Sequence, residues 1–524
     1  MAVCLMAALG MMSGCGGEEK QGVTVSTLGA DPEKVYPVKS TSTLTYWVRS
    51  KASKVTPDFN DSAFAEALQE QTGIKVNFIT PPVGQEQEQF NIMLASGKYP
   101  DIIETPYHAA YFPGGGGRAI ADNILIDLKE PLEKWGPNTL KVFEQYPDAK
   151  QICMTNEGAY FAFPFVRETY EQRIYQGLII RQDWLDDLGL ARPETIDEWE
   201  NVLRAFKEQK GADAPLSFHM TLLNSNAFIG AYGIGRALYL EDGTVKFGPA
   251  MPEYKEFLAT FRRWFEEGLL DRNILTIDAA SAVVDANILN ERTGATIGNA
   301  ASGIGKWMKL MEGKNERFNL TGVKYPVLQK GDRPKFGRLD VGEIPVVSVT
   351  TACKDVEAAV RLLDYGYSPR GHMLMNWGIE GESYFVDGNG DVQYLPALKN
   401  NDRQLSEIDM LSYYTCGTGP MIQDKQVMRL NFPLPQQTEA IQIWGDTDAL
   451  EHSLPNLTRA EQDADDVARI TNDISTYCDQ MLAKFLTGSE PLEHFDQYVE
   501  QLKALNVEKL IAINQRACDQ FMSN

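Results

Sequence analysis

Apolar and polar positions follow two different rhythms between residues 43 and 104. Short β-branched and aromatic runs predict strands, and the stretches between them, with apolar residues three or four apart, predict helices. The predicted strands are Thr43–Val48, Ile74–Ile79 and Asp101–Glu104, and the predicted helices are Ala63–Gln71, ending at Gly73, and Gln85–Ala95, ending at Gly97. Strands that alternate with helices are typical of a parallel sheet flanked by helices. Because ligands of such sheets bind beyond the carboxyl ends of the strands, we expect a site after Trp47 and after Glu104.

The same alternation returns further along the chain. Leu178–Ile180 predicts a strand, and Thr195 followed by Glu198 forms a capping box that opens a helix to about Lys210. Other helical patterns cover Pro252–Glu267, Lys354–Tyr365 and two long amphipathic stretches at the end, Leu457–Leu486 and Leu492–Phe521. The pattern therefore indicates an α/β protein in both halves.

The first fifteen residues carry an apolar run, a Ser13-Gly14 step and then Cys15. The run is too short to span a bilayer, and its flanks are those of a signal peptide. We interpret residues 1–14 as a bacterial lipoprotein signal peptide, Cys15 as the lipidated residue and residues 15–42 as a flexible tether. This places the protein on the extracellular face of the cell membrane. The alternative is a frayed apolar N-terminus.

Composition narrows the class of protein. A chain of 524 residues exceeds what one hydrophobic core usually supports, so we expect at least two domains. The net charge of −23 argues against nucleic acid as a partner, because phosphate binding needs a basic face. Beyond Cys4 and Cys15, the remaining cysteines are widely spaced and form no zinc motif, although one disulfide stays open: Cys153, Cys353, Cys416, Cys478 and Cys518.

Five stretches carry a resemblance to a known family. They are Phe90–Ile103, Arg181–Leu190 with Pro193–Trp199, Gly294–Trp307, Trp377–Tyr384 and Ala512–Ala517. Together they make the chain similar to the family 1 extracellular solute-binding proteins of bacterial ABC sugar importers. The resemblance is nearest to the long lipoprotein subgroup that includes alginate-oligosaccharide-binding proteins.

The resemblance implies a two-lobed periplasmic-binding-protein-like α/β fold of type II. Its ligand cleft lies between lobes that are joined by hinge crossings. Lobe 1 is expected to comprise residues 43–164 and 335–420, and lobe 2 residues 165–334 and 421–524. The implied function is that of a monomeric, non-catalytic receptor, which captures an oligosaccharide and delivers it to the permease subunits of an ABC transporter.

Relatives in this subgroup often carry an Asp/Asn-rich calcium loop after the helix that follows the DWLD stretch. Here Lys207–Pro215 is short and lacks alternating oxygen ligands, so we expect no metal and no cofactor. The Asp387–Asp391 segment has ligand-like spacing. Its glycines, and the absence of the later glycine and glutamate of a calcium loop, favour a hairpin turn instead.

A sugar site combines aromatic rings that stack on C–H faces with polar side chains that bind hydroxyls. The aromatic candidates lie near strand ends or in loops, and the polar candidates accompany them: Trp47, Tyr107, Tyr111, Trp307, Trp377 and Tyr384, with Arg49, Arg181, Asn226, Asn299 and Glu380. Each aromatic residue could instead pack in the core or the hinge. Arg181 could form a salt bridge with Asp183 or Asp186, and Asn226 could be a turn residue.

Two other functions stay open on the sequence. Glu380 and Glu382 could be an acid pair of a surface polysaccharide-degrading enzyme, although two carboxylates in one loop do not show that they oppose each other. The five histidines form no catalytic signature. A peptide ligand on the same fold is the third possibility.

Overall fold

The β-branched and aromatic runs of the N-terminal part pair into the sheet that they predict. In the computed structural model of the chain, β1 (Thr43–Trp47) pairs in parallel with β2 (Lys75–Ile79) and β3 (Ile102–Thr105). β10 (Val346–Val349) runs antiparallel between β3 and β4 (Phe163–Arg167), and β13 (Met421–Gln423) is parallel to β4 at the edge. Every strand of this six-stranded sheet except β10 therefore points its carboxyl end to the same side.

The structure describes residues 35–48, 55–82, 84–105, 111–112, 115–155, 157–278, 282–339, 345–402, 407–455, 457 and 459–523. The expected signal peptide, Cys15 and most of the expected tether lie outside them, as do Arg49 and Tyr107.

Helices cover the first sheet, and their ends follow local chemistry. Gly73 and Gly97 adopt the left-handed conformation directly after α1 and α2, as the sequence predicts, because a glycine has no Cβ to clash there. The helices of this lobe are α1 (Ala63–Thr72), α2 (Glu86–Ser96), α4 (Gly115–Ala121), α5 (Lys129–Trp135), α6 (Pro137–Gln145), α7 (Pro147–Ile152), α13 (Val356–Tyr365) and α14 (Pro369–Asn376). Their apolar faces and the strands bury one continuous core.

A small satellite packs beside this lobe. The hairpin of β11 (Tyr384–Val386) and β12 (Val392–Tyr394) turns at Asp387, whose carboxylate accepts hydrogen bonds from the backbone N–H groups of Asn389 and Asp391. The predicted turn is therefore confirmed. Three short helices accompany the hairpin: α15 (Pro396–Lys399), α16 (Glu407–Leu411) and α17 (Lys425–Asn431).

The second lobe is built on a three-stranded antiparallel sheet. β5 (Gln176–Arg181) lies between β8 (Ala295–Asn299) and β9 (Leu320–Val323) and runs antiparallel to both. Because β5 follows the first crossing from lobe 1, its amino end lies nearest to that lobe. The carboxyl ends of β8 and β9 lie at the same edge, since Gln176 pairs with Asn299 and Leu178 with Val323.

Helices surround this sheet and extend from it. The predicted capping box is present: Thr195 Oγ1 accepts from the Glu198 N–H, and the Glu198 carboxylate accepts from the Thr195 N–H. The helices are α8 (Gln182–Leu188), α9 (Ile196–Lys210), α10 (Pro252–Glu266), α11 (Val283–Leu289), α12 (Lys306–Met311), α18 (Pro435–Gly445), α19 (Ala449–His452), α20 (Ala464–Thr487), α21 (Phe495–Ala504) and α22 (Val507–Ser523). A hairpin of β6 (Leu238–Glu241) and β7 (Thr244–Phe247) completes the lobe.

The C-terminal helical pattern differs from its prediction in two respects, the first being that α20 begins at Ala464 rather than at about Leu457. The stretch predicted as one helix over Leu492–Phe521 forms two helices, α21 and α22. Asn506 separates them in the left-handed conformation at φ 68°, which asparagine tolerates better than most side chains. Both helices keep their apolar faces against the second core.

Strand pairing and core membership move several expected boundaries by a few residues. Residues 165–167 and 421–423 belong to the first lobe, because β4 and β13 pair there. Phe336 and Leu339 pack in the core of the second lobe, so this lobe extends past the expected boundary at residue 334. The last residues of the expected tether are also ordered against lobe 1: Tyr36 OH donates to the Arg361 carbonyl, and the Val38 N–H donates to the Thr72 carbonyl, both at 2.7 Å.

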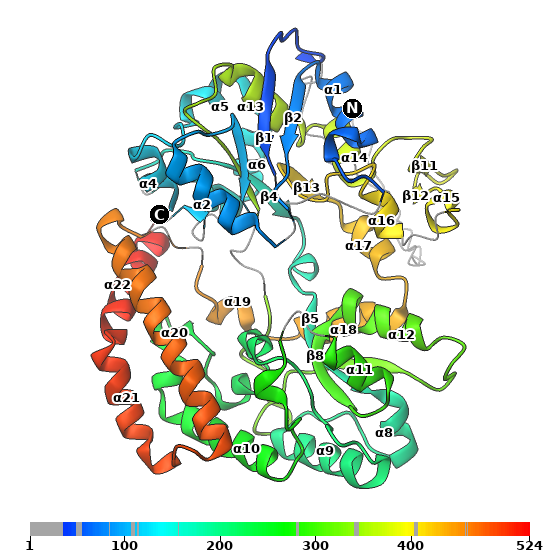
Figure 1. Cartoon of the computed structure of the whole chain (residues 1–524), viewed down its shortest axis with the longest axis vertical. Helices are drawn as coiled ribbons and strands as arrows, with labels where there is room; N and C mark the ends of the chain where they lie inside the picture. Colours follow the sequence, from blue (N-terminus) through cyan, green and yellow to red (C-terminus); the bar gives the residue numbers. More distant parts are fainter. Residues whose placement is uncertain are drawn as a thin grey trace, which may run out of the picture.

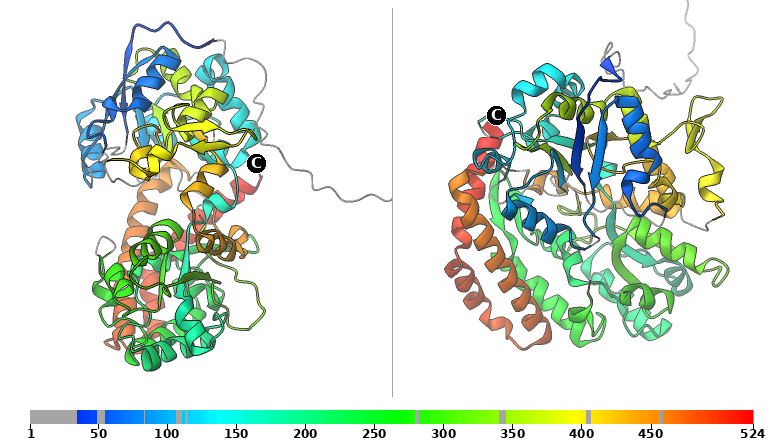
Figure 2. Two further views of the ribbon diagram at one scale, coloured as in Figure 1. Left: turned by 90° about the vertical axis from the view of Figure 1, so that its right-hand side faces the viewer. Right: turned by 45° about the horizontal axis from the view of Figure 1, so that its top comes forward.

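Two lobes result, one above the other in Figure 1, with chain segments crossing between them. The satellite of β11, β12 and α15 lies at the side of the upper lobe. The C-terminal helices run along the lower lobe, and their upper end reaches the upper lobe in both figures, where η9 (Glu461–Asp463) contacts α4 (Figure 2). This is the α/β two-lobed architecture that the sequence predicts.

Candidate functional site

One edge of the lobe 2 sheet faces the crossings, and polar side chains gather there. Asn299 at the end of β8 accepts a hydrogen bond from Gln176 Nε2 at 2.9 Å and donates from Nδ2 to Ser302 Oγ at 3.2 Å. Asn299 and Gln176 are partly exposed, and Ser302 is exposed. Ser302 belongs to a π-helical turn over Ala300–Gly305, a conformation that often occurs at functional sites. Two amides and a hydroxyl thus lie together at the lobe 1 side of lobe 2.

An aromatic ring and a guanidinium group complete this edge. Arg338 lies with its guanidinium 5.9 Å from the centre of the Tyr175 ring and donates from Nη2 to the Tyr175 hydroxyl at 3.3 Å. Tyr325 fixes the arrangement, since its hydroxyl donates to the Gln176 carbonyl at 3.0 Å and accepts from the Arg338 N–H at 2.9 Å. Burial raises the pKa of the Tyr325 phenol far above its ordinary value, so it stays a neutral hydrogen-bonding group.

We call Tyr175, Gln176, Asn299, Ser302 and Arg338 the edge cluster. A partly exposed ring beside amide, hydroxyl and guanidinium groups can stack on an apolar C–H face and bind neighbouring hydroxyls. Only Asn299 among these residues is a candidate from the sequence. Tyr175 and Gln176 could have been found from the expected lobe boundary after residue 164, because a strand that enters from the other lobe must present its amino end to that lobe.

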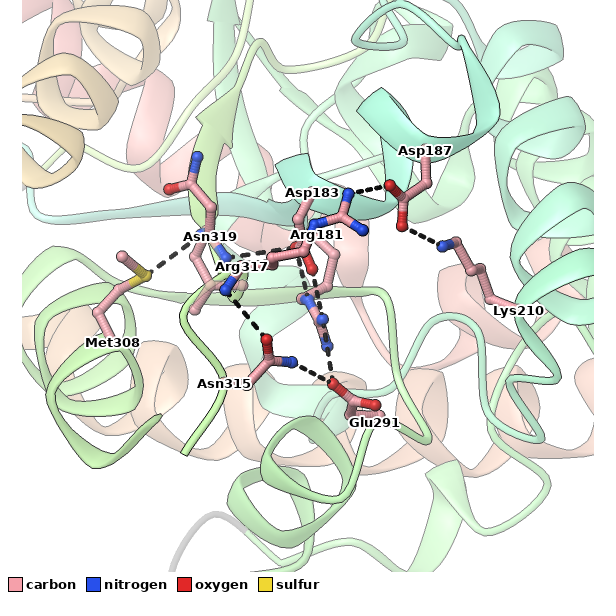
Figure 3. Close-up of polar contacts among 10 residues, drawn as sticks. Arg181, Asp183, Asp187, Lys210, Glu291, Met308, Asn315, Arg317 and Asn319 are labelled. Atoms are coloured by element: carbon pink, nitrogen blue, oxygen red, sulfur yellow. Dashed lines mark hydrogen bonds and ion pairs between the residues drawn. The ribbon is translucent and has the colours of Figure 1, made fainter. Parts of the chain in front are cut away.

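Arg181 lies at the opposite end of β5, which corrects its expected place in the cleft. It lies five residue steps along the strand from Gln176, or roughly 17 Å at the rise of a β-strand. Its guanidinium is 1 % exposed and donates to both oxygens of Asp183, at 2.8 and 2.6 Å, and to Glu291 at 3.3 Å (Figure 3). The rings of Trp184 and Phe318 lie 4.6 and 4.4 Å from it. The structural alternative, a salt bridge with Asp183, is the one observed.

Two of the predicted stacking tryptophans are buried in the protein. Trp307 lies against Gly298 and Gly303, which leave room for its ring, and donates from Nε1 to Asp285 at 2.6 Å. Trp377 is fully buried, lies 5.0 Å from the Tyr394 ring and donates from Nε1 to Asp424 at 3.0 Å. In this conformation neither ring presents a face to a ligand.

The acceptor of the Trp377 hydrogen bond is itself held as a carboxylate. Burial alone would raise the pKa of Asp424, but hydrogen bonds from His372, the Gln426 N–H and Trp377 outweigh it and lower the pKa. Asp424 caps α17 directly after β13. Trp377 is therefore part of the link between β13 and α17.

The remaining candidates divide into three places. Trp47 and Tyr111 pack together around Phe90 in the core of lobe 1. Glu380 is exposed and forms a backbone β-bridge with the buried Tyr384. Both residues lie with Trp377 in the satellite. Asn226 adopts the left-handed conformation and accepts from the Arg236 N–H at 2.7 Å, which fits the turn-residue alternative. Cys15, Arg49 and Tyr107 lie outside the described residues and stay predictions.

The region where relatives carry a calcium loop holds an ion pair here. Gly211 ends α9 in the left-handed conformation, and the Asp213 carboxylate two residues later accepts from Arg292 Nε at 2.9 Å and Nη2 at 2.7 Å. Within the described residues, no three His, Cys, Asp or Glu side chains gather as a metal site would require. The residues present do not fit a divalent cation.

Comparison with known proteins identifies the class. Residues 54–373 match the family of bacterial extracellular solute-binding proteins, and the chain belongs to this family. The fold and the lobed arrangement agree with that membership. None of the helices in the described part combines the length and hydropathy needed to cross a bilayer. The cysteines in that part are buried, and none of them forms a disulfide there.

Several relatives align over most of their length. The fructooligosaccharide ABC transporter substrate-binding protein FusA of Streptococcus pneumoniae serotype 4 is 23 % identical and aligns with 100 % of this chain and 98 % of its own. Lipoprotein LipO of Bacillus subtilis is 25 % identical over 67 % of this chain and 69 % of its own. Among solved structures, the alginate-binding protein AlgQ2 without calcium ion superposes with a TM-score of 0.74 at 20 % identity, covering 93 % of this chain and 100 % of AlgQ2.

Proposed function

We propose that this solute-binding protein captures an oligosaccharide between its lobes and passes it to the permease of an ABC transporter. The edge cluster is the observation that carries the proposal. It places the Tyr175 ring, two amides, a hydroxyl and the Arg338 guanidinium at the side of lobe 2 that faces lobe 1. The relatives named for fructooligosaccharide and alginate binding support a carbohydrate ligand.

In this proposal lobe 1 supplies ligand contacts from residues that follow the carboxyl ends of its parallel strands. These ends point to one side of the sheet, and β4 leads from that side into the first crossing. Arg49 and Tyr107 follow β1 and β3, and we keep both as proposed ligand contacts together with Asn299. Bending at the crossings would bring the two faces together around the sugar.

The proposal includes no catalysis. The family consists of binding proteins, and Glu380, one of the two carboxylates that suggested a glycosidase, lies in the satellite rather than at the edge cluster. The proposal also includes attachment to the extracellular side of the membrane through a lipid on Cys15. The lipoprotein relative LipO supports this attachment.

Titration calorimetry of the purified chain with fructooligosaccharides, alginate oligosaccharides and a short peptide tests the proposal. We expect one of the sugars to bind and to remain chemically unchanged. Tyr175→Ala and Asn299→Ala should each weaken binding about five- to tenfold, since each removes a contact that contributes about 1 kcal/mol. Asn472→Ala on the exposed side of α20 is the matched control and should bind as the parent does.

Three outcomes would count against the proposal. Binding of the peptide alone would favour the peptide alternative, and shortened sugar products would favour the enzyme. Unchanged sugar affinity in both Tyr175→Ala and Asn299→Ala would remove the edge cluster from the site.

A further inference from the structure

A cavity lies where lobe 1 meets the first crossing. Its volume is about 220 Å³, and its walls come from the end of α6, from α7, from the end of β4 and from η3 (Glu171–Arg173) in the crossing. One water molecule occupies roughly 30 Å³ in the liquid, so the cavity has room for a polyatomic ion. It is smaller than the roughly 300 Å³ at which drug-sized ligand pockets begin, which argues against an oligosaccharide.

Arg173 lines this cavity with a guanidinium that lacks a hydrogen-bond partner within the described part of the chain. Its Nε is buried and unpaired, and the side chain as a whole is only 22 % exposed. The nearest acid is Asp148, whose Oδ2 lies 3.8 Å from Nη1, beyond hydrogen-bond distance, and which is 73 % exposed. A buried N–H without an acceptor is costly, so it calls for an acceptor supplied from outside the chain.

The polar groups around Arg173 are mainly donors. Arg167 brings a second guanidinium from the end of β4, 5.8 Å from the Phe165 ring. Gln145 and Tyr146 add an amide and a phenol. Burial, reinforced by the charge of Glu168, raises the pKa of Tyr146 to about 12, so the phenol keeps its proton and can donate. Asp148 is the one carboxylate among the lining residues.

We propose that this cavity binds a small oxyanion, a phosphate or a carboxylate, between Arg173, Arg167 and Tyr146. Planar guanidinium groups pair with the oxygens of such anions through two parallel hydrogen bonds. The exposed Asp148 opposes the anion at one side and limits its affinity. The site is separate from the edge cluster, and its existence does not depend on the proposed sugar ligand.

The position of Arg173 connects this site to the relation between the lobes. Tyr170 and Ile174, on either side of η3, pack around Gly445 of α18 in lobe 2. The other lining residues belong to lobe 1. An anion held by both sides therefore ties the first crossing to lobe 1. If crossing geometry changes when the lobes close, anion and sugar must alter each other's affinity by the same factor.

Thermal unfolding and titration calorimetry of the full chain test the site, with sodium phosphate and sodium malonate as probes and sodium chloride at equal ionic strength as reference. We expect one of the two probes to raise Tm by several degrees over chloride, because a ligand that binds only the native state stabilises it. Preference for phosphate would identify the inorganic ion as the ligand class, and preference for malonate a carboxylate. Equal Tm in all three salts would overturn the proposal.

Three variants locate the effect. Arg173→Gln should abolish binding of the preferred probe, and Asp148→Asn should tighten it severalfold by removing the opposing charge. Arg262→Gln removes an arginine from α10 and is the matched control, with binding as in the parent. Undiminished binding in Arg173→Gln would overturn the assignment. If that variant does not fold, unchanged affinity in Asp148→Asn would overturn it instead.

Discussion

Arg181 is a charged residue that lobe 2 holds entirely with its own side chains. Its guanidinium lies between two rings and binds Asp183 through two hydrogen bonds inside the protein. A buried pair of this kind need not stabilise the fold more than apolar residues of similar size. Removing one partner is different, because it leaves the other charge buried without compensation.

We therefore expect Arg181→Ala to lower the free energy of unfolding by about 3–5 kcal/mol. Ligand affinity of the folded fraction should stay unchanged, since Arg181 lies at the far end of β5 from the edge cluster. Arg317→Ala, which removes an exposed partner of Asp187 in the same region, should change stability little (Figure 3). Urea unfolding and sugar titration measure both quantities. A loss of affinity with intact stability would return Arg181 to the ligand site.

Asp364 carries a buried carboxyl group whose negative charge lowers the stability of the folded protein at neutral pH. Burial raises the pKa of Asp364 from 3.8 to about 6, although hydrogen bonds from Thr139 and Asn138 act in the opposite direction. When the pH lies between these two pKa values, the folded protein binds a proton at Asp364 that the unfolded chain does not bind. Stability from this group is therefore present at low pH and lost as pH rises towards 6.

Between pH 4 and pH 7 we expect this group to lower the free energy of unfolding by about 3 kcal/mol at most. Asp364→Asn should remove it, because the new amide has no charge and Asn138, whose Oδ1 has no partner among the described residues, can turn to accept from it. The stability of the variant relative to the parent should then be higher at pH 7 than at pH 4.5. Chemical unfolding at both pH values measures this difference, and an equal difference at both would contradict the raised pKa.

At the scale of the element, local signals predicted helices and strands well. The Thr195–Glu198 capping box, the glycines after α1 and α2 and the Asp387 turn each depend on residues a few positions apart, so their outcome was readable from the sequence. The direction of a strand could not be predicted from local residues, because it depends on where the chain enters a lobe. The carboxyl ends of β8 and β9 lie at the edge cluster, whereas Arg181 lies at the opposite side of the sheet, since β5 runs the other way.

Side-chain burial was equally out of reach of sequence patterns. Trp307 and Trp377 occur in loops or at helix ends, as ligand-stacking residues do, yet their indole N–H groups pair with Asp285 and Asp424 and their rings pack inside. The partners are 22 and 47 residues away along the chain, so no local pattern announces them. The edge cluster could not be predicted for the same reason, since the Arg338–Tyr175 contact spans 163 residues.

The end of α9 supports a prediction about metal ions. Arg292 occupies the Asp213 carboxylate with two nitrogens, so a fixed cation already neutralises the acid at this turn. Adding Ca²⁺, or a chelator, should leave Tm unchanged. Arg292→Ala should lower Tm slightly, and Ca²⁺ should not restore it. Differential scanning calorimetry with and without Ca²⁺ decides this, and a Ca²⁺-dependent rise in the parent would show a metal site.

At the scale of the whole molecule, attachment to the membrane can be tested separately from binding. We expect Cys15→Ala, expressed in a bacterium that lipidates secreted proteins, to move the protein from the membrane fraction to the soluble fraction while sugar binding is kept. The thioether-linked lipid is the only attachment in the proposal. Cys353→Ala, at a buried cysteine of lobe 1, is the control and should remain with the membrane. Retention of both variants would refute the lipid anchor.

The fastening of Tyr36 and Val38 to lobe 1 has a mechanical consequence for an anchored protein. Tyr36 is hydrogen-bonded to α13 and Val38 to the end of α1, so a lipid on Cys15 would hold the protein through lobe 1. Fully extended, the 20 residues 15–34 could span about 70 Å between such a lipid and lobe 1. In an anchored protein lobe 1 would therefore be the lobe tethered to the membrane, and lobe 2 would be the one that moves towards it on sugar binding.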